Sequence, residues 1–301
     1  MTPKDFLNFI RWKNVIMISL IMLLIKYVLF EKFELNTTLD TVHYALLTVS
    51  TLFVAIAGYI INDIYDVEAD RINKPHRLYV GKKLPRTTAY HLFIGFNSAG
   101  LLIGMYLSYY VGHTSYFIIY VITSLLLYQY AKYLKKKFLV GNILVSFTVF
   151  LSIILPVVFD LLPVTNALNE AGQLIAVRLV GLFGIFGFFL TFLREVVKDL
   201  EDTEGDEAIG ARTVPIVMGE KKTKALVSTI AVIMCLSVVF FAYILLEMGL
   251  YAPVYLSIFV AAPLVYFTID LWRAQNKKQL HRSSAILKVI MLLGTLTLLL
   301  I

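Results

Sequence analysis

Long apolar stretches alternate with short polar ones along nearly the whole chain. Nine of these stretches approach the length of about 20 residues that a helix needs to cross the hydrocarbon layer of a membrane. The predicted spans are residues 15–30, 42–62, 89–112, 115–131, 138–159, 173–193, 223–246, 251–269 and 286–301. The pattern therefore predicts an all-α polytopic membrane protein with about nine transmembrane helices. Eight is the alternative count, because the third and fourth stretches are barely separated.

Composition supports the membrane class and narrows it. Of the 301 residues, 59% are hydrophobic and only 16% are charged, whereas a soluble domain carries about 25% charged residues. The length suits one membrane domain covering residues 1–301. The formal charge of +7 does not indicate nucleic acid binding, because the basic residues fall in short loops between the spans. The single cysteine, Cys235, lies in an apolar run, which excludes a disulfide framework and a thiolate metal site. We expect the first apolar run to be a retained span rather than a cleaved signal peptide.

The distribution of basic residues predicts the orientation in the membrane. If the N-terminus is cytoplasmic, 24 of the 27 Lys and Arg residues fall in segments on the cytoplasmic side. This is the bias that the positive-inside rule describes. The exceptions are Lys26, Lys32 and Arg178, and we expect Lys26 and Arg178 to extend their charged ends outward to the membrane surface. The sequence thus predicts an integral protein of the cell membrane.

Two acidic clusters follow apolar spans, and both fall on the predicted cytoplasmic side. The first lies in residues 62–70 and contains Asn62, Asp63, Asp66 and Asp70; the second lies in residues 194–206 and contains Glu195, Asp199, Asp202 and Asp206. Spacings of three and four residues place side chains on one face of a helix, if the helix continues past the span. Ionisable groups beside membrane spans are costly and usually mark a functional site. A solvated helix end is the alternative for either cluster alone, and the matched pair argues against it.

The charge of these clusters predicts a bound cation. Carboxylates about 5–6 Å apart repel one another by roughly 3 kcal/mol at an effective dielectric constant of about 20. Mg²⁺ relieves such repulsion, takes one or two carboxylates, and fills its remaining positions with water and phosphate oxygens. The sequence therefore predicts Mg²⁺ held against a diphosphate whose departure the metal would assist.

Basic and aromatic residues near the clusters fit a diphosphate substrate. Arg and Lys are the usual phosphate partners, and aromatic faces can stabilise a cation left behind by a departing allylic diphosphate. The candidates for contact with the substrate are Arg77, Tyr130, Lys135, Lys198 and Arg212. For the basic residues the alternative is a topology signal, for Lys135 also an anchor on the inner side or a contact with lipid head groups, and for Tyr130 an interfacial anchor. An isoprenoid tail would lie among the apolar helices.

These residues resemble the UbiA superfamily of intramembrane prenyltransferases. The first motif is similar to the family's N-D-x-x-D-x-x-x-D, and residues 73–77 resemble its N-x-P-x-R, although Leu78 stands where a second proline is common. Asp202 and Asp206 match the family's D-x-x-x-D. Residues 210–213 resemble the G-x-x-T after it, and residues 130–135, followed by Gly141 and Asn142, resemble the basic stretch after the fourth span. The resemblance covers nearly the whole chain.

The resemblance implies nine helices around a central cavity capped by cytoplasmic loops, and Mg²⁺-dependent transfer of a polyprenyl group from its diphosphate to an acceptor. It implies that the Mg²⁺ ligands are Asn62, Asp66, Asp70, Asp202 and Asp206, and we add Asp63 as a candidate metal ligand. Arg77 and Lys135 would contact the diphosphate. We predict that the catalytic residues are Asp66, Asp70, Asp199 and Asp202, with Asp199 serving the acceptor rather than the metal.

The second motif most resembles the digeranylgeranylglyceryl phosphate synthase branch of the superfamily. That branch transfers a geranylgeranyl group to a hydroxyl of geranylgeranylglyceryl phosphate and so forms an ether lipid. The alternative acceptor is aromatic, a hydroxybenzoate or dihydroxynaphthoate, as in quinone biosynthesis. A transporter or a non-catalytic isoprenoid-binding protein is the rival class; acids at helix ends rather than at the membrane midplane disfavour a transporter, and two intact motifs disfavour mere binding. The oligomeric state and the group that accepts the proton stay open.

Overall fold

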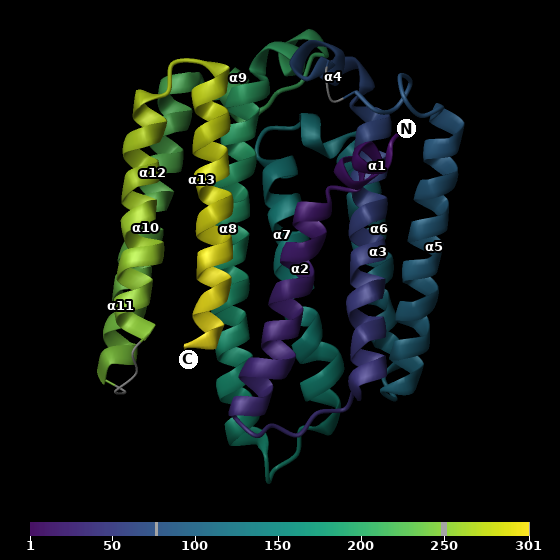
Figure 1. Cartoon of the computed structure of the whole chain (residues 1–301), viewed down its shortest axis with the longest axis vertical. Coiled ribbons are helices and arrows are strands. Elements are labelled where there is room, and N and C mark those ends of the chain that lie inside the picture. The colour runs from purple at the N-terminus through teal and green to yellow at the C-terminus, as the bar shows by residue number, and fades with distance from the viewer. Residues whose placement is uncertain (76–77, 248–251, 301) are drawn as a thin grey trace. The chain divides into compact units, whose positions relative to one another are not determined.

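The computed structural model describes residues 1–75, 78–247 and 252–300, and within them the chain is built from helices (Figure 1). Nine helical segments among these residues are long and apolar enough to cross a membrane. They are Trp12–Phe30, Thr41–Tyr65, Arg86–Tyr110, Thr114–Lys132, Val140–Val164, Glu170–Ala208, Glu220–Leu246, Ala252–Arg273 and Lys277–Leu299. Each overlaps one of the nine predicted spans. The prediction of an all-α polytopic membrane protein is therefore confirmed.

The helices group into two compact units. The first unit is Met1–Lys135 with Leu151–Leu182, and the second is Lys136–Phe150 with Phe183–Ile301. The first contains α1 (Pro3–Phe9), α2 (Trp12–Leu24), α3 (Thr41–Tyr65), α4 (Val67–Asn73), α5 (Arg86–Tyr110) and α6 (Phe117–Lys132). The second contains α9 (Val214–Met218), α10 (Glu220–Glu247), α11 (Ala252–Leu256), α12 (Ala262–Arg273) and α13 (Lys277–Leu296). Helices α7 (Val140–Pro156) and α8 (Glu170–Ala208) contribute residues to both units.

In the first unit, α3 packs against α5 and α6 (Figure 1). Small residues make this approach possible. A Cβ atom at Gly100 of α5 would stand 2.8 Å from Cγ2 of Val54 and 3.1 Å from the carbonyl oxygen of Ser50, both on α3. A Cβ atom at Gly104 would stand 2.6 Å from the ring of Tyr120 on α6. Close backbone approach through small residues is the common way in which membrane helices associate.

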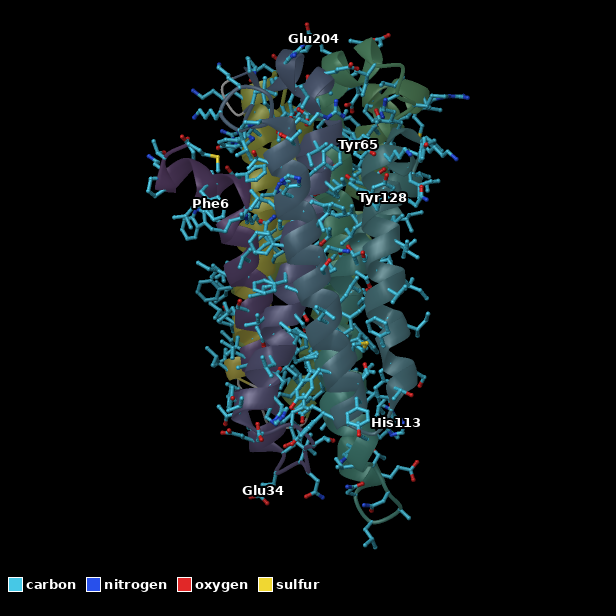
Figure 2. All side chains as sticks on the ribbon, turned by 90° about the vertical axis from the view of Figure 1, so that its right-hand side faces the viewer. Phe6, Glu34, Tyr65, His113, Tyr128 and Glu204 are labelled. Atoms are coloured by element: carbon cyan, nitrogen blue, oxygen red, sulfur yellow. The ribbon has the colours of Figure 1, made fainter. Side chains whose placement is uncertain are left out.

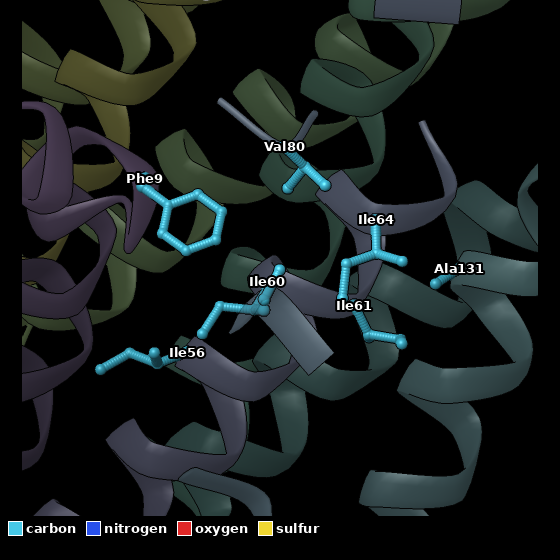
Figure 3. Packing of buried hydrophobic residues seen from close by; sticks show 8 residues of the cluster. Phe9, Ile56, Ile60, Ile61, Ile64, Val80 and Ala131 are labelled. Atoms are coloured by element: carbon cyan, nitrogen blue, oxygen red, sulfur yellow. The ribbon is translucent and has the colours of Figure 1, made fainter. Parts of the chain in front are cut away.

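A buried apolar cluster supports the end of α3 that carries the first acidic motif. Ile60, Ile61 and Ile64 alternate with the motif's polar residues and are at most 1% exposed. They pack in a cluster with Phe9 of α1 and Val80 of the loop that follows α4 (Figure 3). Burying a large aliphatic side chain contributes about 1.5–3 kcal/mol. The packing therefore holds the polar side of this helix end in a fixed orientation.

Lys26 corrects one expectation from the sequence. It lies in a π-helical turn, Ile25–Phe30, and it is only 8% exposed, so its side chain does not extend to the membrane surface. Its Nζ atom donates to Oδ2 of Asp160 at 2.8 Å, to the carbonyl oxygen of Leu39 at 2.8 Å and to Oγ1 of Thr37 at 2.9 Å. Asp160 lies in a second π-helical turn, Val157–Leu161, and accepts a hydrogen bond from the Leu39 N–H at 2.7 Å. The charge of Lys26 can be buried because the carboxylate of Asp160, 134 residues further along the chain, lies beside it.

In the second unit, polar contacts hold the hairpin of α12 and α13 together. Asp270 is 3% exposed; it pairs with Arg282 and accepts a hydrogen bond from Oγ of Ser283 at 2.7 Å. Lys224 of α10 donates to the carbonyl oxygen of Ala274 at 2.6 Å, just after α12 ends. These contacts satisfy buried polar groups and fix how α10, α12 and α13 meet at this end of the unit.

Candidate active site

The first motif lies where α3 ends and α4 begins. Asp66 has φ −90° and ψ 0°, which divides the two helices. The condition that the helix continues unbroken past the span is therefore not met in the first motif. The break is local, because the N–H of Asp66 still donates to the carbonyl of Asn62 at 2.9 Å, and the N–H of Asp70 to that of Asp66 at 2.8 Å. Asn62, Asp66 and Asp70 therefore still lie on successive turns.

Asp66 is at the centre of the contacts in this motif. Nδ2 of Asn62 donates to Oδ2 of Asp66 at 2.6 Å, and Nζ of Lys135 forms an ion pair with Oδ1. Oδ1 of Asn62 is buried and has no hydrogen-bond partner within the described residues. A buried amide oxygen without a partner is costly. Because its own amide nitrogen is fixed by Asp66, this oxygen is oriented to accept a ligand.

Asp63 is bound by a residue that the sequence did not single out. Nη2 of Arg11 donates to Oδ1 of Asp63 at 2.9 Å, and the guanidinium carbon lies 4.8 Å from the ring centroid of Tyr59. Arg11 has φ 54° and lies at the break between α1 and α2. In the sequence, Arg11 is a basic residue before the first span, and such a residue equally well indicates only the orientation in the membrane. Asp63 stays a candidate metal ligand, but in this structure its charge is balanced by Arg11.

Aromatic hydroxyls lie beside this motif. Tyr65, the last residue of α3, contacts Tyr128 of α6 with 3.3 Å between the hydroxyl oxygens and 6.2 Å between the ring centroids (Figure 2). Tyr130 is half-buried in the last turn of α6. Asp70 is half-buried in the first turn of α4, and Arg77 lies outside the described residues. The structure thus brings Lys135 and Asn62 to Asp66, and it leaves the predicted roles of Tyr130 and Arg77 as predictions.

The second motif lies on α8, which runs without interruption from Glu170 to Ala208. This helix continues well past the predicted span, so the spacing of the acidic residues does place them on one helical face. Oε1 of Glu195 accepts from Nη1 of Arg194 at 3.0 Å and from Nζ of Lys198 at 2.6 Å. Asp202 and Asp206 lie about one and two turns beyond Lys198 and are half-buried. Arg194 and Lys198, bridged by Glu195, therefore lie nearer the apolar run than Asp202 and Asp206 do.

Asp199 is held by a second side chain that the spacing alone did not reveal. Nδ2 of Asn142 in α7 donates to Oδ2 of Asp199 at 2.8 Å. Asn142 is 7% exposed, and it follows the basic stretch noted in the sequence. Arg212 contributes its backbone here, since its N–H donates to the carbonyl of Lys136 at 2.8 Å while its side chain is exposed. The predicted contact of the Arg212 side chain with substrate stays a prediction.

The first motif offers oxygen donors that fit Mg²⁺. Within the described residues, no three Asp, Glu, His or Cys side chains gather closely enough to hold a metal ion by themselves. Mg²⁺ does not require such a cage, because it is usually bound by one or two carboxylates together with water and substrate phosphate. The oriented Oδ1 atom of Asn62 and the neighbouring carboxylate of Asp66 are hard oxygen donors of the kind that this ion prefers.

Comparison with known proteins agrees with this arrangement of motifs. The model of the UbiA prenyltransferase family matches residues 33–292, a range that includes both motifs. The chain belongs to the UbiA prenyltransferase family. The resemblance inferred from the motifs is thereby confirmed. Among curated relatives, digeranylgeranylglyceryl phosphate synthase of Methanothermobacter thermautotrophicus is 31% identical over 235 residues, covering 77% of this chain and 75% of the relative.

Solved structures of family members share the fold. One, described as giving structural and mechanistic insights into digeranylgeranylglyceryl phosphate synthase in membranes, superposes with a TM-score of 0.64 at 26% identity and covers 98% of each chain. A UbiA homologue from Archaeoglobus fulgidus, bound to GPP and Mg²⁺, superposes with a TM-score of 0.58 at 15% identity; the match covers 98% of this chain and 99% of the homologue. The second likeness establishes the fold alone, whereas the first also agrees with the branch that the second motif resembles.

Proposed function

We propose that this protein transfers a geranylgeranyl group from geranylgeranyl diphosphate to the free hydroxyl of geranylgeranylglyceryl phosphate, with Mg²⁺ as cofactor. The observation that carries the proposal is the 31% identity to a digeranylgeranylglyceryl phosphate synthase over three quarters of both chains. The second motif, with Lys198 and Asp199 ahead of Asp202, is similar to that branch as well. The family match runs through both compact units, which supports one domain over residues 1–301.

The reaction exchanges one carbon–oxygen bond for another. The bond between C1 of the geranylgeranyl group and the diphosphate oxygen breaks, and the diphosphate leaves with the electron pair. The acceptor's hydroxyl oxygen forms the new ether bond to C1, and its proton passes to a base. Bound Mg²⁺ would neutralise the charge that develops on the departing diphosphate. From the resemblance to the family, we assign Mg²⁺ binding to Asn62, Asp66 and Asp70 in the first motif and to Asp202 and Asp206 in the second. We assign diphosphate contact to Lys135 and Arg77.

The contact of Lys135 with Asp66 supports this role. Its side chain is 11% exposed and its Nζ atom is already fixed on Asp66. A cation held against a metal-binding carboxylate lies within reach of a phosphate that the same metal binds. The rings of Tyr65 and Tyr128 lie beside the motif, and their faces can stabilise positive charge on the allylic carbon as the bond breaks.

Asp199 is our candidate for the group that receives the acceptor's proton. It is fixed at Oδ2 by Asn142, and it lies on the side of the motif nearer the apolar run than Asp202 and Asp206. An acceptor with its own isoprenoid tail would approach from that side. We expect Asp199→Asn to lower kcat for prenyl transfer while the affinity for Mg²⁺ is retained. Unchanged turnover in this variant would exclude the role.

The proposal is tested by Mg²⁺-dependent release of diphosphate from purified protein supplied with geranylgeranyl diphosphate and geranylgeranylglyceryl phosphate. Asp66→Asn and Asp202→Asn should each lower the rate at least 100-fold, because each removes a carboxylate charge that stabilises the metal–diphosphate complex. Glu204→Gln is the matched control, since it removes a carboxylate charge from the opposite, exposed face of α8 and should leave the rate within twofold. Full activity in the Asp66 or Asp202 variant would refute the assignment.

We also propose that both motifs face the cytoplasm across the cell membrane. The bias of Lys and Arg toward alternate loops supports this orientation. It would place the reaction on the side of the membrane where a phosphorylated, water-soluble head group is accessible.

A further inference from the structure

One face of α8 carries a group of polar residues that the metal site does not require. Thr191, Arg194 and Lys198 are spaced three and four residues apart, so they lie along one side of the helix. They precede the metal-binding Asp202 and lie nearer the apolar run. Residues 191–198 contain two cations and one carboxylate, so their net charge is positive. In contrast, Asp199, Asp202 and Asp206, which follow them on the helix, are all acidic.

The guanidinium of Arg194 has an unused edge. Its recorded hydrogen bond within the described residues uses Nη1, which donates to Glu195. Its Nε atom is buried and has no hydrogen-bond partner among those residues. Nε and Nη2 together form the side of the guanidinium that binds two oxygens of one phosphate or carboxylate. Glu195 therefore binds Nη1 and leaves the edge formed by Nε and Nη2 to a ligand.

Thr191 provides a second buried group without a partner. Its side chain is 4% exposed, and Oγ1 has no hydrogen-bond partner in the described part of the chain. Buried Thr hydroxyls in helices usually bond back to the carbonyl four residues earlier, as Thr203 does on this same helix at 2.9 Å. Thr191 makes no such bond within the described residues. It lies one turn from Arg194. Two unpartnered donors one turn apart point to an oxygen-rich ligand.

We propose that Thr191, Arg194 and Lys198 bind the phosphate of the acceptor glycerolipid, at a subsite separate from the one that holds the donor's diphosphate. This inference rests on the proposed function. Eight residues of helix, about 12 Å along the axis, separate Arg194 from Asp202, and eleven residues, about 16 Å, separate Thr191 from Asp202. A phosphate held by Thr191 and Arg194 would therefore be centred more than two helical turns from Asp202. A phosphate monoester binds two cations without a metal, which matches the local charge.

The alternative source of the same chemistry is the donor's diphosphate, and steady-state kinetics separates the two. The purified wild type and Arg194→Gln would be assayed with geranylgeranyl diphosphate and two acceptors: geranylgeranylglyceryl phosphate and the unphosphorylated geranylgeranylglycerol. Arg194→Gln should raise KM for the phosphorylated acceptor at least tenfold, in line with loss of a charged hydrogen bond. KM for the donor, and the rate with the unphosphorylated acceptor, should stay within twofold of the wild type.

Three further variants keep the test decisive. Arg178→Gln removes an exposed arginine from the far end of α8 and should behave as the wild type. If Arg194→Gln fails to fold, Thr191→Val with Thr203→Val as its matched control replaces it, and Thr191→Val alone should raise KM for the phosphorylated acceptor. A rise in KM for the donor, or an equal loss with both acceptors, would overturn the inference. Absence of transfer to either acceptor by the wild type would instead refute the proposed function.

Discussion

At the scale of residues, several ion pairs of this protein join groups that are distant in sequence. Among them are Lys26 with Asp160, Arg11 with Asp63, and Lys135 with Asp66. A buried charge is tolerated when a partner and further hydrogen bonds replace the water it loses. Lys26 and Asp160 satisfy this condition through contacts with each other, with Thr37 and with Leu39, none of which belongs to either motif, so their role can be tested apart from catalysis.

The Lys26–Asp160 pair gives a stability prediction. Lys26→Met and Asp160→Leu should each lower the free energy of unfolding by about 3–5 kcal/mol, because each leaves a buried charge without its partner. The double variant should lose less than the sum of the two, since neither charge is then present. The free energies of unfolding of the three variants in detergent would check this, with the exposed Arg178→Gln as control. Additive losses would contradict the prediction.

The residues recognised from the sequence were those whose spacing along one segment carries the information. Asn62, Asp66 and Asp70 recur at helical intervals, as do Asp199, Asp202 and Asp206. Arg11 and Asn142 were not assigned roles, because each meets its carboxylate across a tertiary contact that separates them by 52 and 57 residues. The sequence also predicted an outward-pointing Lys26, since the position of Asp160 is set by packing rather than by periodicity.

At the scale of helices, the match between expectation and structure was closest for the spans. The apolar stretches were long, and helices are the main way to satisfy backbone groups within a membrane. The ends were less predictable. Helix α3 breaks at Asp66, whereas α8 continues through the second motif to Ala208. The acidic residues have helical spacing in both motifs, so the spacing alone did not distinguish a helix that breaks from one that continues.

Close packing of α5 gives a second prediction. Gly100→Ala would place a Cβ atom 3.1 Å from a backbone oxygen of α3 and 3.2 Å from a backbone nitrogen, neither of which can move easily. We expect a loss of about 1–3 kcal/mol, as for other overpacked sites. Gly95→Ala is the matched control on the same helix, because a Cβ atom there meets nothing within 4 Å, and it should be neutral or stabilising by up to about 1 kcal/mol. Thermal unfolding in detergent would compare them, and a Gly100→Ala protein as stable as Gly95→Ala would refute the argument.

At the scale of the whole molecule, the nine spans in the described residues and the distribution of Lys and Arg predict one orientation. In a Cys235→Ala background, a single cysteine at Lys82 or Lys222 should react with a membrane-impermeant maleimide only after cells are opened. A cysteine at Lys32 should react in intact cells. All three positions are exposed, so the difference reports the side of the membrane. Labelling of the Lys82 or Lys222 position in intact cells would reverse the proposed orientation.

The identity of the acceptor is the central claim, and product analysis tests it most directly. Purified protein with Mg²⁺ and geranylgeranyl diphosphate would be offered geranylgeranylglyceryl phosphate, a hydroxybenzoate or a dihydroxynaphthoate in separate reactions, and the products would be identified by mass spectrometry. We predict a diether phosphate from the first acceptor, lost on removal of Mg²⁺ and in Asp66→Asn, and no prenylated aromatic product. A prenylated aromatic product without the diether phosphate would contradict the account and assign the protein to an aromatic acceptor.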